Sequence, residues 1–536
     1  MKKEDIRINA VILLIASLMY LALLSPFSVT RAANAAMPVY RSSGDEQTSI
    51  IIRLSWDSKA VDNILTILKE AGEKVTFAVT EELASGSPSL ISKIARSGHE
   101  VSLLASSGED LEKACGLLER ITGRRQTFVV TDSKGAQSLV SCAKELSRWT
   151  EIEVLEMGYH PIEVTENTVV VRGQMRDVMR LNLHLRTAHR VLVPLLRADC
   201  RNIRDLYELA RSIDWENLIE ADGYFSVSSI VHNFTIRDTR IPSLYTKDAI
   251  ADRMRDKCQR RPDSGGENHG AAVFVYWERD EVIIYLDTSG EPLSKRGYRK
   301  IPGSAPLQET LAAACIMALH WDGKSPFVSP MCGSGTPAIE AVMMAMNKAP
   351  GSLKGHFAFQ SVKGYTHIIP GEKAPNVAPR QYAGATPEQI WKEIVLEAKA
   401  KEKTEGLPPV IATDISPDAV ENAHSNAIAA GVAQYITFQT CDFAETPVPD
   451  QKGVVFFNPE YGIRLGTYEE LAPVYTRIGF FLHEKCSGYT GGLITGNPDL
   501  ARLVELYYKT RVPFFNGPID CRLFIYPGCE LKGQNK

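Results

Sequence analysis

Residues 327–340 read FVSPMCGSGTPAIE. The first letters predict a short apolar strand and the middle a tight loop with Gly333 and Gly335, and Pro337 suits the first turn of a helix. Glycine permits a close backbone approach, and a helix N-terminus presents free N–H groups and a positive dipole end to the loop. The stretch therefore predicts a cofactor-binding edge of an open α/β sheet. Taken alone, a Gly-x-Gly turn is also an ordinary strand–helix connection, so the signals elsewhere in the chain decide.

The composition is that of a globular protein with several domains. The chain has 536 residues, of which 44% are hydrophobic and 23% charged, and its net charge is −4. Two to four domains are expected from this length. Because the chain is not a polycation, any contact with nucleic acid has to come from a local basic patch. The 10 cysteines contain no Cys-x-x-Cys pair, which argues against a zinc site or a disulfide scaffold.

The N-terminus has the pattern of an export or anchoring segment. Lys2, Lys3 and Arg7 precede an uncharged apolar run over residues 8–27, and residues 33–35 read Ala-Asn-Ala, which suits a signal-peptide cleavage site. We expect residues 1–36 to be a signal peptide or a membrane anchor. A buried helix and a wrongly placed start site remain open.

Strands and helices alternate over residues 48–126, which predicts parallel βαβ units. This region resembles the first half of a polysaccharide deacetylase domain through LSWD at 54–57, ILKEAG at 67–72, VTF at 75–77 and SGHE at 97–100. The metal site of that family needs two adjacent aspartates and two histidines. Here Ser58 follows Asp57, and Leu103, Leu104 and Ser107 stand where histidines would be sought. One carboxylate without an imidazole cannot build the site, so we expect a degenerate, non-catalytic scaffold.

Three later stretches resemble the THUMP-containing rRNA guanine methyltransferases of the RlmL type. They read LNLHLRTAHRVL at 181–192, RSIDW at 211–215 and DTSGEPLSKRGYR at 287–299. The resemblance runs from about residue 127 to residue 529. It implies a THUMP-type RNA-binding region of α+β structure at 127–290 and a Rossmann-like class I methyltransferase domain at 291–529, so the fold class is α/β. Within the first of these regions, residues 134–146 have the spacing of a helix.

Two basic clusters are candidate RNA contacts. Cationic side chains hold phosphates, and an aromatic ring can stack on an unpaired base. Each cluster is equally compatible with a solvated surface, because charge runs are common there. The first cluster, at residues 253–261, contains Arg253, Arg255, Lys257, Arg260 and Arg261, and the second, at residues 295–300, contains Lys295, Arg296, Tyr298, Arg299 and Lys300.

Two carboxylates follow the glycine loop at the spacing of successive βα units. Asp414 ends an apolar strand and suits the two adjacent hydroxyls of a ribose, although a helix N-cap is the other interpretation. In the family pattern Asp442 accepts a hydrogen bond from the adenine amine of S-adenosylmethionine, and Phe443 lines the ring; an ordinary polar loop remains open. The expected cofactor-binding residues are Pro330, Gly333, Ser334, Gly335, Asp414, Ile415, Asp442 and Phe443.

Residues 454–462 read VVFFNPEYG and resemble the Asn-Pro-Pro-Tyr motif of methyltransferases that act on exocyclic amines. Such an amine is a poor nucleophile because its lone pair is delocalised into the ring. The side-chain carbonyl of Asn458 and the backbone carbonyl of Pro459 can accept its two hydrogens and direct the lone pair at the methyl group, and Tyr461 can stack on the extruded base. These three residues are the predicted catalytic residues. A Pro-Gly turn at a strand end is the alternative interpretation.

Two residues depart from the family pattern. Glu460 replaces the second proline of the motif, and Ser329 stands where an acidic residue usually precedes the glycine loop. We expect an S-adenosylmethionine-dependent RNA methyltransferase that acts on a guanine exocyclic amine in large-subunit rRNA, with its methyltransferase part in the cytoplasm. Two rivals remain: a catalytically impaired RNA-binding relative, and a membrane-associated envelope protein with a deacetylase-like domain. The conflict between the N-terminal segment and cytoplasmic chemistry leaves an anchor or a fused reading frame open.

Overall fold

The computed structural model divides the chain into two compact units, Met1–Lys134 and Gly135–Lys536. Residues 1–36, where a signal peptide or anchor is predicted, lie outside the residues that the structure describes, and so does Asp57. Within the described residues, no helix is both long and apolar enough to cross a membrane. The described residues are 39–41, 48–54, 58–71, 74–79, 81–106, 120–122, 129–132, 136–233, 236, 238, 240–266, 270–301, 307–363, 386–462 and 466–531.

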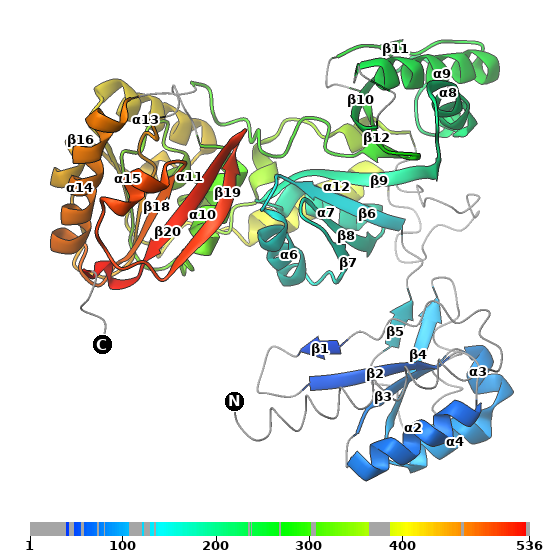
Figure 1. The fold of residues 1–536 in the computed structure, drawn as a ribbon. Coiled ribbons are helices and arrows are strands. Elements are labelled where there is room, and N and C mark those ends of the chain that lie inside the picture. Colours follow the sequence, from blue (N-terminus) through cyan, green and yellow to red (C-terminus); the bar gives the residue numbers. More distant parts are fainter. Residues whose placement is uncertain are drawn as a thin grey trace. The chain divides into compact units, whose positions relative to one another are not determined.

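The first unit is a five-stranded sheet with helices (Figure 1). Its strand order is β1-β2-β3-β4-β5, with β1 antiparallel to β2 and the other pairs parallel. His99 is a core residue here: its Nδ1 accepts a hydrogen bond from the Val75 amide at 3.4 Å, and its ring packs edge-on against Phe77. The elements are β1 (Val39–Arg41), β2 (Thr48–Leu54), α2 (Ser58–Ala71), β3 (Thr76–Val79), α3 (Glu81–Gly86), α4 (Pro88–Arg96), β4 (Glu100–Ser106) and β5 (Val129–Asp132). The deacetylase resemblance of this region remains a prediction.

The N-terminal half of the second unit is built on one eight-stranded sheet of order β11-β10-β12-β13-β9-β6-β8-β7. Strand β9 pairs with β6 through residues 188–192 and with β13 through residues 192–199, so its two ends join the two parts of this sheet. The elements are β6 (Ala136–Cys142), α6 (Ser147–Glu156), β7 (Pro161–Val164), β8 (Thr168–Gly173), α7 (Met175–His184), β9 (Ala188–Asp199), α8 (Ile203–Ser212), β10 (Tyr224–His232), α9 (Arg240–Cys258), β11 (Asp263–Ser264), β12 (Ala271–Glu278) and β13 (Glu281–Asp287).

The helix predicted over residues 134–146 is wrong, because strand β6 occupies most of that range. Burial along β6 alternates with a period of two, with Ser138, Val140 and Cys142 turned inward. The strand pairs antiparallel with β8 on one side and β9 on the other, which satisfies its backbone groups on both edges. These non-local pairings override the local helical spacing of the apolar residues.

The C-terminal half holds a seven-stranded sheet of order β16-β15-β14-β17-β18-β20-β19. The first five strands are parallel, and β20 is antiparallel to both of its neighbours. This is the mixed α/β fold expected from the sequence. Its elements are α10 (Glu309–Ala318), β14 (Phe327–Pro330), α11 (Thr336–Ala345), α12 (Pro387–Ala400), β15 (Val410–Asp414), α13 (Pro417–Ala430), β16 (Ile436–Thr440), β17 (Val454–Phe457), α14 (Tyr468–Lys485), β18 (Thr490–Thr495), α15 (Pro498–Arg502), β19 (Thr510–Asn516) and β20 (Ile519–Tyr526).

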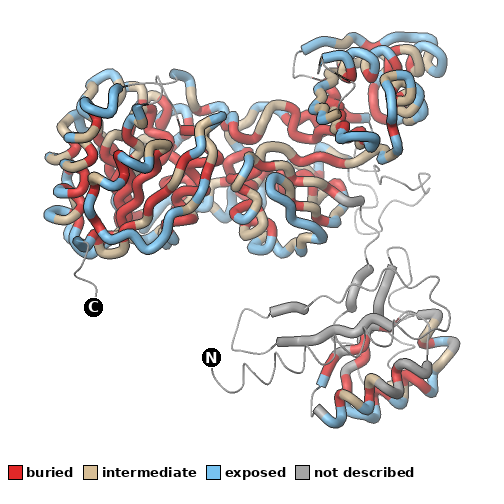
Figure 2. The backbone as a smooth tube through the Cα atoms, viewed as in Figure 1, coloured by how far each residue is buried: buried red, intermediate tan, exposed pale blue. Residues whose placement is uncertain are grey.

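Successive side chains of the central strands supply two different cores. Phe456 packs into a core with α10, α11 and α13, whereas its neighbours Val455 and Phe457 pack into a second core with α14 and α15. Strand β17 is consequently apolar throughout and buried on both faces, and Figure 2 shows that the middle of this sheet is buried. A sheet covered on both faces leaves only its edges for a ligand site.

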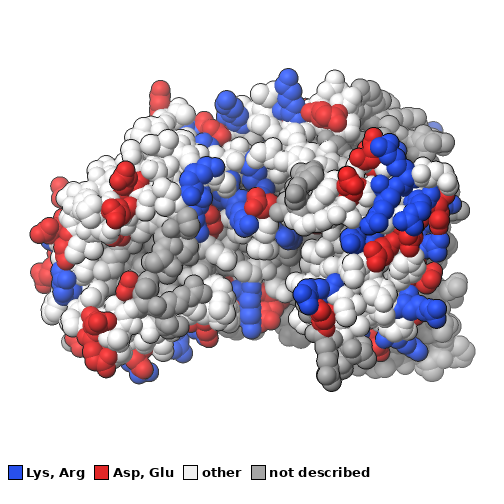
Figure 3. Space-filling model, turned by 90° about the horizontal axis from the view of Figure 1, so that it is seen from above, with Lys and Arg blue, Asp and Glu red and all other residues white. Residues whose placement is uncertain are grey.

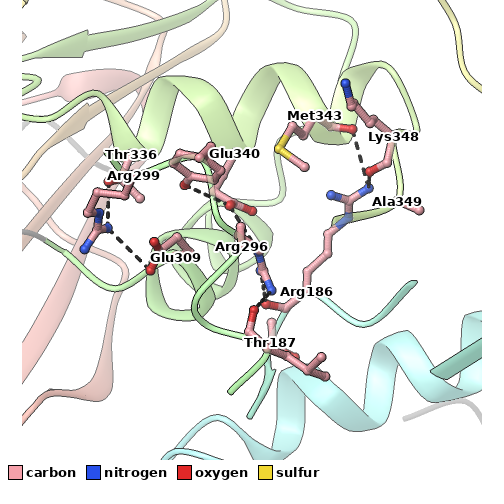
Figure 4. A network of polar contacts seen from close by, with 12 residues as sticks. Arg186, Thr187, Arg296, Arg299, Glu309, Thr336, Glu340, Met343, Lys348 and Ala349 are labelled. Carbon is pink, nitrogen blue, oxygen red and sulfur yellow. Dashed lines mark hydrogen bonds and ion pairs between the residues drawn. The ribbon is translucent and has the colours of Figure 1, made fainter. Parts of the chain in front are cut away.

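A network of buried polar side chains joins the segment before α10 to helix α11 (Figure 4). The Arg296 guanidinium is 1% exposed; its Nε lies 3.4 Å from Glu340 Oε1, and its Nη1 donates to the Leu293 carbonyl at 2.6 Å. Tyr298 donates its hydroxyl to the same Glu340 oxygen at 3.0 Å. Farther along, Arg186 Nη2 donates to the Lys348 carbonyl, just beyond the end of α11, at 2.9 Å. The middle of α11 is thus bonded to the segment before α10, and its C-terminal end is bonded to Arg186 of the eight-stranded half.

The prediction that Arg296 and Tyr298 contact RNA is therefore wrong. Both side chains are fully buried, and their polar groups are directed at Glu340 inside the protein. Arg299 is also turned inward, where it donates to the Leu307 carbonyl at 2.6 Å and to the Thr336 hydroxyl at 2.9 Å. Of the cluster at residues 295–300, only Lys295 and Lys300 are exposed.

Arg253 in the other basic cluster is likewise committed to the fold. Its guanidinium makes a bidentate pair with Glu216 at 2.7 Å and a further contact with Asp214, so it clamps α9 to the turn after α8. Its prediction as a phosphate contact is wrong for the same physical reason as for Arg296: a carboxylate of the protein already uses its donors. The rest of the cluster is exposed, with Arg255 paired to Asp252 on the surface.

Replacing Arg296 by alanine should lower the free energy of unfolding by about 3–5 kcal/mol, because it leaves the buried Glu340 without its counter-charge. Lys295→Ala is the matched control: that lysine is exposed, and its surface pair with Glu291 should contribute less than about 1 kcal/mol. Urea unfolding followed by tryptophan fluorescence measures both. Equal shifts for the two variants would show that the Arg296 pair is not needed for the fold.

Candidate active site

The carboxyl ends of β14, β15 and β17 meet at one edge of the seven-stranded sheet. Strand β14 pairs in parallel with β15 on one side and with β17 on the other. Parallel strands point the same way, so the loop after Pro330, the carboxylate of Asp414 and the side chain of Asn458 all emerge at this edge.

The loop after β14 is fastened to the end of β15 by two hydrogen bonds. The Gly333 amide donates to Asp414 Oδ2 at 2.9 Å, and the Cys332 amide donates to the Thr413 carbonyl at 2.8 Å. Asp414 Oδ1 accepts from the Ser416 amide at 3.0 Å, which orients the carboxylate across the loop. Asp414 thus braces the loop while each of its oxygens retains a lone pair for a ligand.

The two glycines of the loop are required for different reasons. Gly335 has a φ of +81° and lies against α13, where an added Cβ would come within 2.8 Å of the Ala423 Cβ. Gly333 has a φ of +52°, and no atom lies within 4 Å of the position of its Cβ. Gly335 therefore serves the packing of α11 on α13, whereas Gly333 keeps the ligand side of the loop open.

Asp442 lies at the end of the neighbouring strand β16 and is held by a cation. Its Oδ1 accepts from the Ala444 amide at 2.9 Å and from Arg477 Nη2 at 2.6 Å. Partial burial by itself raises the pKa of Asp442, but these two donors outweigh it and hold that pKa below its usual value. Among the residues that the structure describes, none donates to Oδ2, so this oxygen is the acceptor left for a ligand.

Phe443 is buried beside Asp442, and its ring sits in an aromatic cluster. It packs edge-to-face with Phe457 and Phe481, and the Arg477 guanidinium lies 4.8 Å from its centroid. Arg477 therefore links Asp442 and Phe443 into one unit, with the charge of the first and the ring face of the second both in contact with it.

The segment after β17 is fixed by side chains from two other elements. Tyr475 donates its hydroxyl to the Glu460 carbonyl at 2.9 Å, and Asn497 Nδ2 donates to the Tyr461 carbonyl at 3.4 Å. The Tyr461 hydroxyl donates to Asn458 Oδ1 at 2.7 Å. Burial raises the pKa of Tyr461 well above its usual value, so this hydroxyl keeps its proton and remains a donor at neutral pH.

One cavity of about 650 Å³ unites these parts. Pro330 and Gly335 are not on its wall: Pro330 is buried at the end of β14, and Gly335 faces α13. Ser329 is buried inside β14 and also lies away from the wall. The wall includes the predicted residues Gly333, Ser334, Asp414, Ile415, Asp442, Phe443, Asn458, Pro459 and Tyr461.

Several residues of the wall were missed from the sequence. Arg477 comes from α14, and Asn516 and Ile519 come from the hairpin of β19 and β20. No local motif marks them, because α14 and the hairpin reach the cavity only through the fold. Asp418, in the first turn of α13, lies four residues after Asp414 and could have been inferred from that spacing.

Family comparisons assign a domain to each half of the second unit. Residues 137–192 match the RlmL ferredoxin-like domain, residues 200–287 match the THUMP domain, and residues 296–525 match the RMKL-like methyltransferase domain. The three matches follow one another in the order of an RlmL-type THUMP methyltransferase.

Solved structures of the same fold cover most of this chain. One from Listeria monocytogenes, described as a predicted N6-adenine-specific DNA methylase, is 27% identical over 73% of this chain and 96% of its own, with a TM-score of 0.62. One from Clostridium difficile, described as a possible methylase, is 25% identical over 73% and 98%, with a TM-score of 0.62. SMU.472, crystallised with SAH, is 24% identical over 74% and 99%, with a TM-score of 0.63. The cofactor of this fold is accordingly S-adenosylmethionine.

Because the two glycines have different surroundings, we expect one substitution to reduce stability more and the other to reduce cofactor binding. Gly335→Ala should lower the midpoint of unfolding more than Gly333→Ala, since both force a side chain into a left-handed backbone, which costs about 1–2 kcal/mol, but only the first also collides with Ala423. Gly333→Ala should instead weaken S-adenosylmethionine binding, because its methyl group would occupy open space at a residue of the cavity wall. Thermal unfolding and equilibrium dialysis of labelled cofactor give the two quantities. Identical behaviour of the variants would contradict the separate roles.

Proposed function

We propose that this chain, which belongs to the RlmL-type THUMP methyltransferases, methylates the exocyclic amine of a guanine in large-subunit rRNA. The observation that carries the proposal is the single cavity shared by Asn458 and Pro459, the amine acceptors, with Gly333 and Asp414, the cofactor-side residues. A methyl donor and a nucleophilic amine have to meet in one enclosed space, and this cavity is built to hold both.

The ionisable lining of the cavity fits S-adenosylmethionine. Among the described residues, the wall carries the carboxylates of Asp414, Asp418, Asp442 and Glu460 and the cation of Arg477, which is already paired with Asp442. A cavity with this excess of negative charge favours a ligand that carries a sulfonium and an ammonium group. When bound, the cofactor supplies an electrophilic methyl group on a positively charged sulfur.

Each part of the wall has a role in holding the cofactor. The open face of Gly333 and the amides at the start of α11 suit the amino-acid end, and Asp414 suits the ribose hydroxyls. The free Oδ2 of Asp442 suits the adenine amine. Ile415, whose side chain is 70% exposed at the rim, offers an apolar surface for the adenine ring.

Asn458, Pro459 and Tyr461 would hold the target base. The side-chain carbonyl of Asn458 and the backbone carbonyl of Pro459 accept the two amine hydrogens, which localises the lone pair on the nitrogen. The ring of Tyr461 gives the extruded base a stacking partner. In the structure the Tyr461 hydroxyl donates to Asn458 Oδ1, which orients this oxygen and leaves its second lone pair for the incoming amine.

RNA would reach this cavity from the THUMP domain and the exposed part of the cluster at residues 253–261. Viewed from above, Lys and Arg side chains gather over the middle and right of the molecule, toward α8 and α9, whereas Asp and Glu predominate at the left edge (Figure 3). The exposed cations of the two clusters, whose ion pairs with Asp252, Asp222 and Glu291 are weak surface pairs that phosphates could replace, are Arg255, Lys257, Arg260, Arg261, Lys295 and Lys300. The proposal includes the predicted division of the chain into four regions. These are a signal peptide or anchor at 1–36, a deacetylase-like region at 48–126, a THUMP-type region at 127–290 and a methyltransferase domain at 291–529.

The test compares rRNA nucleosides from cells with and without the gene by mass spectrometry. We expect one methylguanosine to disappear with the gene and to return with the wild-type chain. A chain with Asn458→Ala should restore it at least about a hundredfold more slowly, because one of the two amine acceptors is lost. Asn217→Ala changes an exposed asparagine that is not on the wall of the cavity, and it should restore the methylguanosine fully.

An unchanged methylguanosine profile would favour the alternative of an RNA-binding relative that transfers no methyl group. In that case the purified chain should still bind labelled cofactor and rRNA. Loss of cofactor binding by Asn458→Ala would point instead to a collapsed cavity, since Asn458 is assigned to the base and not to the cofactor.

Two substitutions of Tyr461 distinguish the stacking of its ring from the hydrogen bonding of its hydroxyl. Tyr461→Phe keeps the ring and should retain the transfer rate within about tenfold, whereas Tyr461→Ala removes the stacking surface, which is worth about 1–3 kcal/mol per base. The second variant should therefore raise the KM for RNA by about tenfold to a hundredfold, as measured by steady-state transfer of labelled methyl groups. A larger loss for the phenylalanine variant than for the alanine variant would contradict the stacking role.

A further inference from the structure

Glu460 is the one residue of the 458–461 segment to which the proposed function assigns no role toward the base. It stands between Pro459 and Tyr461, and it lines the same cavity. Its backbone is fixed, because the Tyr475 hydroxyl donates to its carbonyl at 2.9 Å and also bonds the Thr495 hydroxyl at 2.8 Å. The segment therefore holds Glu460 in place beside the two amine acceptors.

The carboxylate of Glu460 is free for a ligand. Its side chain is exposed, and within the described part of the chain no hydrogen bond or ion pair reaches it. Arg477, the cation on the same wall, is paired with Asp442 at 2.6 Å. A fixed backbone, an exposed side chain and, among the described residues, no counter-charge paired with it leave its oxygens as acceptors for a donor brought by the substrate.

The Watson–Crick edges of the purines differ at the atom next to the reactive amine. In guanine the 2-amine adjoins a ring N–H at N1, which is a donor. In adenine the 6-amine adjoins an unprotonated N1, which is an acceptor. A carboxylate accepts from the first and meets the lone pair of the second, so it favours guanine and disfavours adenine. The proline that the motif usually has at this position offers no side-chain acceptor.

We propose that Glu460 is a specificity-determining residue that accepts the N1–H of guanine while Asn458 and Pro459 accept the hydrogens of its amine. This inference rests on the proposed function. Three consecutive residues would then accept the three N–H bonds at this edge of guanine. Asn458 and Pro459 accept the two of the 2-amine, and Glu460 accepts the one at N1.

The probe that isolates this contact is 2-aminopurine, which keeps the 2-amine and lacks the N1–H. The position that carries the methyl group is first located by mass spectrometry of rRNA fragments from cells with and without the gene. rRNA from the strain without the gene is then rebuilt by splint ligation with guanine or 2-aminopurine at that position. Wild-type chain should prefer guanine by about tenfold to a hundredfold in kcat/KM. Glu460→Gln should lose most of that preference, since its amide can donate to the bare N1 of 2-aminopurine.

Glu469→Gln is the matched control, because that glutamate is exposed on α14 and is not on the wall of the cavity. It should leave the guanine preference unchanged. Glu460→Pro restores the usual residue of the motif and should retain transfer while losing the preference, which separates a loss of recognition from a loss of folding.

An equal preference in wild-type chain and Glu460→Gln overturns the inference. So does a change confined to the KM for S-adenosylmethionine, which would assign Glu460 to the cofactor amine and not to the base. Transfer by the wild-type chain to neither base defeats the proposed function itself, and the inference falls with it.

Discussion

The hydrogen bond from the Gly333 amide to the Asp414 carboxylate is the contact on which the cavity depends. It joins the loop after β14 to the end of β15, and it exists only because the two strands are parallel neighbours with their carboxyl ends at one edge. The loop, the carboxylate and the segment after β17 are each unremarkable alone. Brought together at that edge, they enclose one cavity in which two ligands can meet.

A second constraint lies behind that edge, in the buried contacts around helix α11. Arg299 bonds the Thr336 hydroxyl at the N-terminus of the helix, and Arg186 bonds the carbonyl of Lys348 beyond its C-terminus. One end of α11 is therefore held by an arginine of the segment that leads out of the eight-stranded sheet, and the other by an arginine of the connection between α7 and β9. The helix that starts at the glycine loop is in this way part of the connection between the RNA-binding and methyltransferase halves.

How much the sequence predicts depends on whether the signal is local. The glycine loop, Asp414, Asp442 and the 458–461 segment were found because each follows its own strand in chain order. Arg477 and Asn516 were not found, since only the fold carries α14 and the β19–β20 hairpin to the cavity. Arg296 and Arg253 were misassigned to RNA because a run of charges looks the same whether it is solvated or paired inside the protein. The local spacing of residues 134–146 predicts a helix instead of strand β6, because the pairing partners of the strand lie far along the chain.

The bond between the Tyr461 hydroxyl and Asn458 has a consequence for how energy is distributed over the reaction. Before any base arrives, one lone pair of the acceptor oxygen is used by the Tyr461 hydroxyl and the other is open to water, so docking of the amine exchanges a hydrogen bond to water for one to the base and yields little net affinity. Attachment of the nucleic acid must then come from contacts remote from the reacting atoms. What the Asn458 oxygen contributes is expressed as the amine becomes pyramidal and its hydrogens grow more acidic. Discrimination at this position should thus appear in turnover more than in occupancy.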